Sequence, residues 1–245
     1  MLSHLRNLRN QFDFFARSHI QFPRPLPFSM PIPKQETQFQ EEVREFLNQL
    51  SWDRFLFKKN KPWRVADVGA KNFSLAPLID ELFLEKNLEV EIHGIEIDAF
   101  RRLSNLHTRA DYGRYFASKA RMARYHSIDF LEFSKPLDLI LMLNPFVTPE
   151  PLQAWGLPLK HFRPSALFDH ASKLLKAQKG FAILSSPNEK EFQIASDLAI
   201  KAGFLLGAPT HWEPRANSIQ KKPRFGRLCY STVENVSDSG KRGSV

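Results

Sequence analysis

Cysteine is almost absent from the sequence. One cysteine, Cys229, occurs among 245 residues, which excludes an internal disulfide framework and any zinc or iron–sulfur site built from several thiolates. The eight histidines show no spacing that is typical of metal ligands. We therefore expect no metal centre.

Long hydrophobic runs are absent as well. None approaches the roughly 18 apolar residues that cross a bilayer, and the longest, residues 137–147, contains an aspartate and an asparagine. Arg6, Arg9 and Asp13 interrupt the start of the chain before the apolar core of a secretory signal can form. We expect no transmembrane segment and a cytoplasmic location.

The first 20 residues place five apolar side chains on one helical face with arginines around it. These are Leu2, Leu5, Leu8, Phe12 and Phe15. The pattern predicts a helix packed on the domain, with an organelle transit peptide or a membrane-surface helix as alternatives.

Acidic residues are fewer than basic ones. The chain has 26 Asp and Glu against 35 Lys and Arg, which gives a formal net charge of +9. This excess favours anionic partners such as nucleic acid, phosphorylated metabolites or acidic membrane surfaces. The hydrophobic share of 42% and the charged share of 25% are ordinary for a globular protein, and the length suits one large domain.

Glycines are missing where a nucleotide-binding turn would need them. The apolar run that ends in Asp67-Val68-Gly69 continues with Lys71 and Asn72. Side chains at these places would crowd a pyrophosphate, which disfavours NAD and FAD, and no Gly-Lys-Ser/Thr sequence is present to form a P-loop. A cofactor without phosphates is compatible with this loop if Gly69 makes the turn and Asn72 takes an unusual backbone conformation.

Strands and helices are expected to alternate from residue 64 onward. We expect strands at 64–68, 89–97, up to 128, 137–143, 181–185, 204–207 and 227–233, and helices at 74–86, 99–124, 164–177 and 189–202. This alternation predicts an α/β fold with an open, mostly parallel sheet and helices on both faces. Ligands of such sheets bind at the carboxyl ends of the strands, here near Gly69.

Three segments are expected along the chain. Residues 1–60 form an N-terminal helical extension, in which a capping box at 37–40 begins a second helix after a strap with five prolines at 22–33. Residues 61–236 form the sheet domain. Residues 237–245 are small and polar, and we expect a disordered tail.

Four short segments include the carboxyl ends of expected strands: Val65 to Gly69, Gly94 to Asp98, Ser127 to Phe130 and Asp138 to Phe146. In this order they resemble the motifs of class I S-adenosylmethionine-dependent methyltransferases. The resemblance covers residues 62–233 and implies a Rossmann-like methyltransferase fold with a seven-stranded sheet and S-adenosyl-L-methionine as the cofactor. Residues 146–148 and 152–158 are similar to an uncharacterised bacterial methyltransferase-like branch.

The resemblance also implies a set of cofactor-binding residues. They are Asp67, Gly69, Lys71, Asn72, Glu96, Asp98 and Asp129. Glu96 would accept hydrogen bonds from the ribose hydroxyls of the cofactor, and Asp129 would contact its adenine amino group. Lys71 would neutralise the cofactor's carboxylate, while its amine and sulfonium face Asp67. Family members commonly carry Gly-x-Gly-x-Gly after the first strand, and this chain keeps only the first glycine.

These polar residues have structural alternatives. Asp67 and Asn72 would then cap the helix that follows them, and Glu96 and Asp98 would cap a helix beginning at Ala99.

Asn144-Pro145-Phe146 resembles the Asn-Pro-Pro-aromatic motif of methyltransferases that act on exocyclic amines of adenine or cytosine, or on glutamine amides. There the asparagine accepts the protons of the amine and the aromatic ring stacks on the target; this chain has one proline fewer. Asn144 and Phe146 are therefore the expected catalytic residues, with a plain strand-to-loop turn as the alternative. Weaker candidates are Tyr112, Arg163 and His211.

Two basic regions, Arg101–Arg124 and Arg215–Arg227, are candidate contacts for RNA or another anionic partner. In the first, Tyr112, Tyr115 and Phe116 lie among the arginines, a combination that suits phosphate contact and base stacking. Ordinary solvated faces and aromatic core packing are the alternatives.

The functional prediction is methyl transfer from S-adenosyl-L-methionine to an unknown acceptor, with RNA and anionic small molecules as candidate classes. Such a transfer is an in-line displacement in which the protein mainly aligns donor and acceptor. A catalytically inactive methyltransferase-like nucleic-acid-binding module and a nucleotide-sugar or NAD-dependent enzyme are the alternatives.

Overall fold

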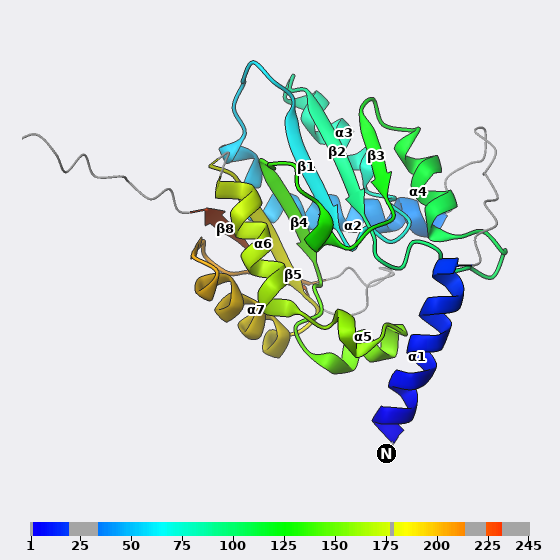
Figure 1. The fold of residues 1–245 in the computed structure, drawn as a ribbon. Helices are drawn as coiled ribbons and strands as arrows, with labels where there is room; N and C mark the ends of the chain where they lie inside the picture. The colour runs from blue at the N-terminus through cyan, green and yellow to red at the C-terminus, as the bar shows by residue number, and fades with distance from the viewer. Residues whose placement is uncertain (1, 20–33, 177–178, 214–223, 232–245) are drawn as a thin grey trace, which may run out of the picture.

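The computed structural model describes residues 2–19, 34–176, 179–213 and 224–231 (Figure 1). The expected strap at 22–33 and the expected tail at 237–245 lie outside the described residues. None of the described helices combines the length and apolar character that a membrane crossing requires.

One sheet runs through the molecule in the order β3-β2-β1-β4-β5-β8-β6, and β7 also pairs with β8. The strands are β1 Trp63–Val68, β2 Val90–Ile95, β3 Ala123–His126, β4 Leu139–Leu143, β5 Phe181–Ser186, β6 Phe204–Leu206, β7 Thr210–Trp212 and β8 Arg224–Ser231. The first five are parallel, whereas β8 is antiparallel to β5. The expected open, mostly parallel sheet is confirmed. Within the described residues it has eight strands where seven were expected, because two short strands, β6 and β7, pair with opposite ends of β8.

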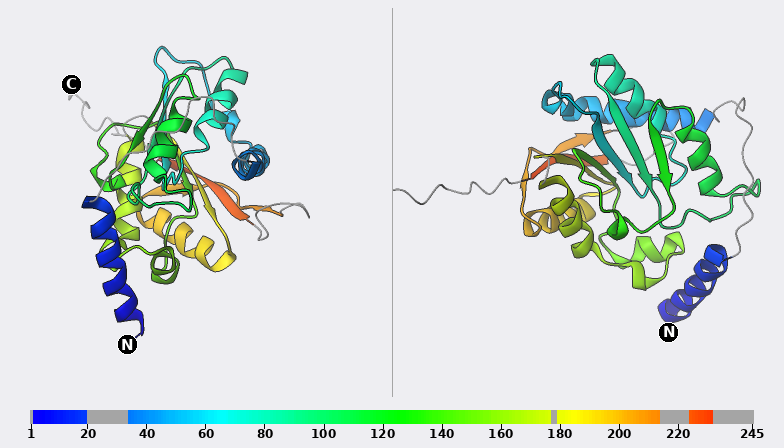
Figure 2. Two further views of the ribbon diagram at one scale, coloured as in Figure 1. Left: turned by 90° about the vertical axis from the view of Figure 1, so that its right-hand side faces the viewer. Right: turned by 45° about the horizontal axis from the view of Figure 1, so that its top comes forward.

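Helices cover both faces of the sheet (Figures 1 and 2). They are α1 Leu2–His19, α2 Lys34–Leu50, α3 Ala76–Glu85, α4 Arg109–Ala117, α5 Pro149–Trp155, α6 Pro164–Lys176 and α7 Glu189–Lys201, with short 3₁₀ helices η1 Trp52–Phe55, η2 Phe130–Glu132 and η3 Leu159–His161. Successive residues of a strand point to opposite faces. Accordingly, Leu139 and Leu141 of β4 join the core under α2 and α3, while Ile140 and Met142 join the core under α6 and α7.

The prediction of one long helix over residues 99–124 is wrong. The helix there, α4, covers only Arg109–Ala117, and Thr108 begins it with a capping box to Asp111. A bridge between Arg102 and Thr108 holds the preceding residues in a turn. Local capping therefore overrode the helical pattern upstream of Thr108.

Two other details of the helices also differ from expectation. The capping box expected at 37–40 does not begin α2, which already includes Lys34. No helix was expected between residues 143 and 164, yet this stretch contains α5, whose first turn carries prolines in positions where their missing N–H costs little.

Candidate functional site

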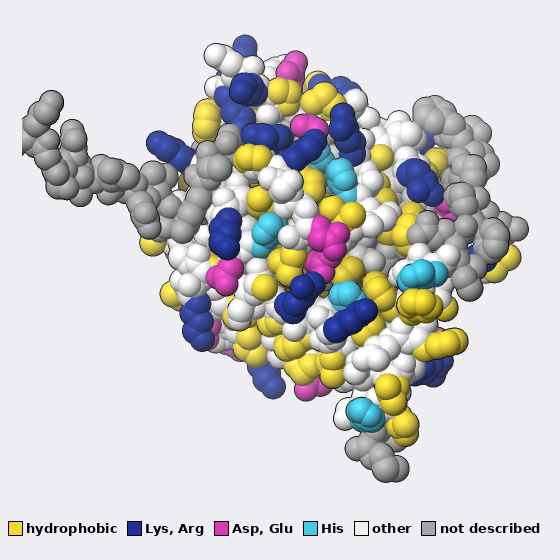
Figure 3. All heavy atoms as spheres, in the orientation of Figure 1, with side chains coloured by type: hydrophobic (Ala, Val, Ile, Leu, Met, Phe, Trp, Pro, Cys, Tyr) yellow, Lys and Arg dark blue, Asp and Glu magenta, His cyan; other side chains and the backbone are white. Residues whose placement is uncertain are grey.

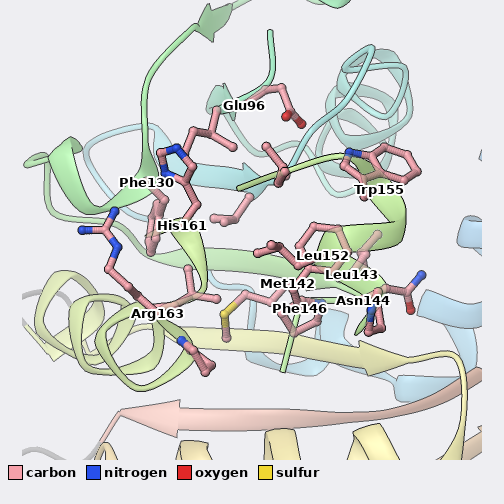
Figure 4. A pocket seen from close by; sticks show the side chains of 18 of the residues that line it. Glu96, Phe130, Met142, Leu143, Asn144, Phe146, Leu152, Trp155, His161 and Arg163 are labelled. Atoms are coloured by element: carbon pink, nitrogen blue, oxygen red, sulfur yellow. The ribbon is translucent and has the colours of Figure 1, made fainter. Parts of the chain in front are cut away.

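A pocket of about 470 Å³ opens at the carboxyl ends of β1, β2 and β4, where the sequence places a ligand. Figure 4 shows Glu96 facing Met142 and Phe146 across it, with His161 and Arg163 on one side and Trp155 and Asn144 on the other. Most of its lining is apolar: Val68, Ile95, Phe130, Met142, Leu143, Phe146, Leu152 and Leu157. Its size and mixture of apolar walls with a few polar groups suit a small organic ligand.

The loop after β1 has a backbone that normally favours glycine. The φ angle is 73° at Gly69, 51° at Lys71 and 60° at Phe73, all in the left-handed region. Their spacing is that of the glycines in a Gly-x-Gly-x-Gly pattern, and two of the three positions carry a side chain here. The left-handed conformation costs a residue with a side chain roughly 1–2 kcal/mol, which other contacts must offset.

Phe73 supplies one such contact. Its side chain is fully buried and lies against Gly94 of β2, where an added Cβ would approach the ring to 2.4 Å. The ring thus takes the space that a side chain on β2 would need. Burial of this large apolar group anchors the loop on the sheet.

Glu96 follows β2, lines the pocket and is only 4% exposed. Its Oε2 accepts a hydrogen bond from the backbone N of Lys71 at 2.9 Å, and its Oε1 accepts one from the backbone N of Asp98 at 2.8 Å. A carboxylate can accept about four hydrogen bonds. Glu96 is therefore held in place by the backbone and retains acceptor capacity toward the pocket.

Asp67, the penultimate residue of β1, is buried and does not line the pocket directly. Burial raises its pKa to about 7; the charge of Lys71 opposes this rise and that of Glu96 adds to it. The alternative that Asp67 caps the next helix is wrong, because α3 begins after Leu75 without a side-chain cap.

Asn72 faces away from the cofactor site predicted for it. It does not line the pocket, and its Nδ2 donates a hydrogen bond of 3.1 Å to Glu36 of α2. It does not cap α3 either. In this structure Asn72 joins the loop after β1 to α2.

Asp98 is buried next to the pocket wall and does not line the pocket. It forms ion pairs with Arg17 at 3.1 Å, with Arg109 at 3.5 Å and with Arg101. No helix begins at Ala99, so the capping alternative for Glu96 and Asp98 is wrong. The contacts of Asp98 instead join α1 to the turn before α4.

Asp129 and Arg163 line the same side of the pocket and form an ion pair. The second carboxylate oxygen of Asp129 accepts a hydrogen bond from the backbone N of Leu131 at 3.0 Å, which caps η2. The structure therefore brings Asp129 to the pocket as expected, and it adds Arg163 as the group that fixes this carboxylate.

Asn144 and Phe146 follow β4 and both line the pocket. Asn144 has a φ of 62°, and its backbone N donates to the carbonyl of Ser185 at 2.9 Å. Its side-chain Oδ1 is buried and has no hydrogen-bond partner among the described residues. A buried acceptor without a partner is costly, and a ligand with an N–H or O–H group would satisfy it.

Trp155 and His161 belong to the pocket but were not among the residues predicted from the sequence. Three cations surround the ring of Trp155, with Lys71 at 5.1 Å, Arg109 at 4.6 Å and Arg101 at 5.5 Å from its centroid. Burial lowers the pKa of Lys71, helped by Arg109 and opposed by Glu96. Trp155 falls within the stretch 152–158 that resembles a methyltransferase-like branch, but that resemblance implied no role for it in the site.

His161 of η3 lies 4.0 Å from Asp129 Oδ2, measured from its Nδ1. Both ring nitrogens are buried without a hydrogen-bond partner among the described residues. Burial lowers the pKa of His161, with Lys160 adding to this effect and Asp129 opposing it. The uncharged ring is thus a second polar group without a partner in the pocket wall.

Two of the weaker candidates lie elsewhere. Tyr112 is buried in α4, where its hydroxyl accepts a hydrogen bond from Asn105 at 2.6 Å. His211 lies in β7 and pairs with Glu213 at 3.0 Å. Neither lines the pocket, whereas Arg163 does.

The first basic region has its rings buried and several of its arginines engaged in ion pairs. Tyr112, Tyr115 and Phe116 form a buried cluster, so base stacking by these rings is excluded and the core-packing alternative is confirmed. Four of its arginines form ion pairs: Arg101 and Arg109 with Asp98, Arg114 with Asp111, and Arg121 with Asp80.

The second basic region is described only from Arg224 onward. Arg224 is buried and donates to Ser185 Oγ at 3.1 Å, and Arg227 lies over the ring of Phe192. An RNA contact therefore stays a prediction, resting on exposed residues such as Arg102 and Arg124 and on residues outside the described part.

The described residues contain no group of His, Cys, Asp and Glu that is suited to hold a metal ion. No protein-family model matches the chain, and no curated protein matches it either.

Solved structures do match the fold. Magnesium protoporphyrin IX methyltransferase from Synechocystis PCC 6803 with bound SAM aligns with a TM-score of 0.53 and 13% identity, covering 93% of this chain and 95% of that chain. The same enzyme with bound SAH gives 0.52 and 12%, covering 95% and 100%. A Listeria monocytogenes protein described as a class I S-adenosylmethionine-dependent methyltransferase gives 0.53 and 13%, covering 99% and 72%. The chain has the fold of class I S-adenosylmethionine-dependent methyltransferases.

Proposed function

We propose that the protein transfers a methyl group from S-adenosyl-L-methionine to an acceptor that binds in the same pocket. The observation that carries this proposal is the loop at 69–73. It keeps left-handed backbone at all three glycine positions and binds Glu96 through the backbone N of Lys71.

The pocket fits the nucleoside part of this cofactor. Glu96 has acceptor capacity left for the two ribose hydroxyls. Phe130 and Leu131 supply an apolar wall beside Asp129. The Asp129 carboxylate would accept a hydrogen bond from the adenine amino group. Because Arg163 and the backbone of Leu131 fix the Asp129 carboxylate, little freedom is lost when it binds.

The amino-acid part of the cofactor would meet the loop after β1. Lys71 lines the pocket and supplies a cation for the carboxylate. Asp67 lies beneath, and its pKa of about 7 lets a nearby cationic amine or sulfonium hold it ionised. The replacement of the second glycine by lysine thus adds a charge contact that a glycine loop lacks.

The cofactor supplies an electrophilic methyl group, which an acceptor takes by in-line displacement. The chain's own residues orient the acceptor and exclude water. Phe146, Leu152 and Trp155 form an apolar wall near Asn144, and Asn144 Oδ1 can accept a hydrogen bond from the acceptor. This geometry favours an acceptor with an N–H group, such as an amine or amide.

A labelling experiment tests the proposal. Purified protein is incubated with S-adenosylmethionine carrying a tritiated methyl group and with separate RNA, protein and small-molecule fractions of a cell extract. We expect label in one fraction with the wild type and with Glu91→Gln, and none with Glu96→Gln. Glu91 is a matched control because it lies in β2 and pairs with Lys135 away from the pocket. Equal labelling by both variants would contradict the assignment of the site.

A further inference from the structure

The helix α1 packs on the protein through a mostly polar face, to which Phe14 adds a ring contact with His161 at 4.8 Å between centroids. Asn10 Nδ2 donates to the carbonyls of Gln153 and Leu157 at 3.1 Å, and Asn7 Oδ1 accepts from the backbone N of Leu159 at 2.8 Å. Arg17 pairs with Asp98 at 3.1 Å. These contacts hold α1 against α5 and η3, the segment that supplies Leu152, Trp155 and His161 to the pocket.

The opposite face of α1 is apolar and exposed. The exposed fractions are 54% for Leu5, 48% for Leu8, 72% for Phe12 and 59% for Phe15. At about 100° per residue, this stripe lies between roughly a third and a half of a turn around the helix from Asn7, Asn10 and Arg17. The sequence pattern predicts a helix with this stripe facing inward, but the structure has it facing outward.

Figure 3 shows hydrophobic side chains exposed along α1, and Figure 2 shows the N-terminal end of the helix extending away from the sheet. No described residue covers the stripe. Four bulky apolar side chains exposed in a row on one helix indicate a surface that binds something apolar.

The charge around the stripe indicates which kind of partner covers it. Arg9 lies beside the stripe on one flank and His4 on the other, whereas Arg6 lies further round the helix, near Arg17. The one acidic residue of α1, Asp13, pairs with Arg9 at 3.6 Å. The whole chain carries a net charge of +9. A second copy of the chain would bring the same positive charge to the contact, whereas an anionic lipid surface brings the opposite charge.

We infer that α1 docks the protein on the surface of an anionic membrane, with Leu5, Leu8, Phe12 and Phe15 inserted among the lipid chains. Arg9 then lies at the level of the headgroups. An amphipathic helix with aromatic and leucine side chains on one face and arginines beside it suits this position. The polar face of α1 keeps the pocket wall formed by α5 and η3 close to the membrane.

Vesicle sedimentation of the full chain tests this inference without any assay of methyl transfer. We expect binding to vesicles of phosphatidylcholine with about one third phosphatidylglycerol, and weaker binding to phosphatidylcholine alone or at high salt. The double variant Phe12→Ser/Phe15→Ser should lower the affinity on the order of tenfold or more. Arg6→Gln/Arg9→Gln should weaken the preference for anionic vesicles, while the remaining positive charge of the chain keeps part of it.

Leu205→Ser/Ile200→Ser is the matched control, because these side chains are 61% and 56% exposed and lie outside α1; it should bind vesicles like the wild type. Equal loss in both double serine variants would overturn the inference. So would a wild type that fails to sediment with anionic vesicles. In that case, a dimer lost in Phe12→Ser/Phe15→Ser would identify a second copy as the occupant, and a lowered Tm of this variant would identify another segment of the same chain.

Discussion

The backbone N of Lys71 lies 2.9 Å from Glu96 Oε2 and donates a hydrogen bond to it, joining the loop after β1 to the end of β2. The contact does not depend on the lysine side chain. It holds both the left-handed backbone at position 71 and the orientation of Glu96, whichever side chain stands at that position. The side chain is then free to serve the pocket.

Replacing Lys71 by methionine tests that side chain. Methionine keeps the length and the backbone hydrogen bond but lacks the charge. We expect affinity for S-adenosylhomocysteine to fall about tenfold, because the carboxylate loses its ion pair. Affinity for 5′-methylthioadenosine, which has no carboxylate, should not change. Calorimetric titration of both ligands measures the difference, and an equal loss for both would show that Lys71 does not contact the carboxylate.

Asp67 predicts a pH dependence of stability. A carboxyl whose pKa rises from near 4 in the unfolded chain to about 7 in the folded protein keeps a proton that the unfolded chain has released. Its contribution therefore lowers the free energy of unfolding as the pH rises from 4 through 7. Asp67→Asn should raise the Tm at pH 8 by a few degrees and leave it unchanged at pH 4. A Tm difference that is the same at both pH values would contradict the raised pKa.

The contact between Phe73 and Gly94 predicts coupled stability effects. Gly94→Ala places a Cβ 2.4 Å from the Phe73 ring and should lower the free energy of unfolding by about 1–3 kcal/mol. Phe73→Leu alone should also destabilise the fold. In the double variant the smaller side chain makes room for the new methyl, so the two losses should fall short of additivity by more than about 0.5 kcal/mol. Urea denaturation of the four proteins measures this coupling; strict additivity would mean that the ring does not occupy that space.

Two substitutions of Asn144 separate the effect of its backbone conformation on stability from the effect of its side chain on methyl transfer. Glycine suits its φ of 62°, so Asn144→Gly should keep the fold better than Asn144→Ala. Both variants lack the side-chain oxygen and should lose methyl transfer roughly 100-fold, while S-adenosylhomocysteine binds as in the wild type. The rate is measured on the fraction that accepts label. Full activity in Asn144→Gly would exclude the side chain from acceptor binding.

The sheet was predictable from the sequence because its central strands are short apolar runs, such as Leu139–Leu143, bounded by turn residues. The positions of Glu96, Asp129, Asn144 and Phe146 at the pocket followed from the rule that parallel strands end at one edge. The hydrogen-bond and ion-pair partners of these residues could not be predicted from that rule.

The failures have physical causes. The helical pattern continues upstream of Thr108, but the capping box of Thr108 begins α4 at that point and the bridge from Arg102 to Thr108 holds the preceding residues in a turn. Trp155 reaches the pocket only because α5 folds back over the strand ends, which no local pattern encodes. The apolar stripe of α1 identified an amphipathic helix, but the hydrogen bonds of Asn7 and Asn10 decide which face turns inward.

Titration calorimetry with S-adenosylhomocysteine tests the central claim most directly. The account predicts binding by the wild type and by Glu91→Gln, and a loss of about 100-fold in Glu96→Gln, because the ribose hydroxyls lose a charged acceptor held by the backbone of Lys71 and Asp98. Absence of binding by the wild type would contradict the account and favour a methyltransferase-like fold that has lost its cofactor.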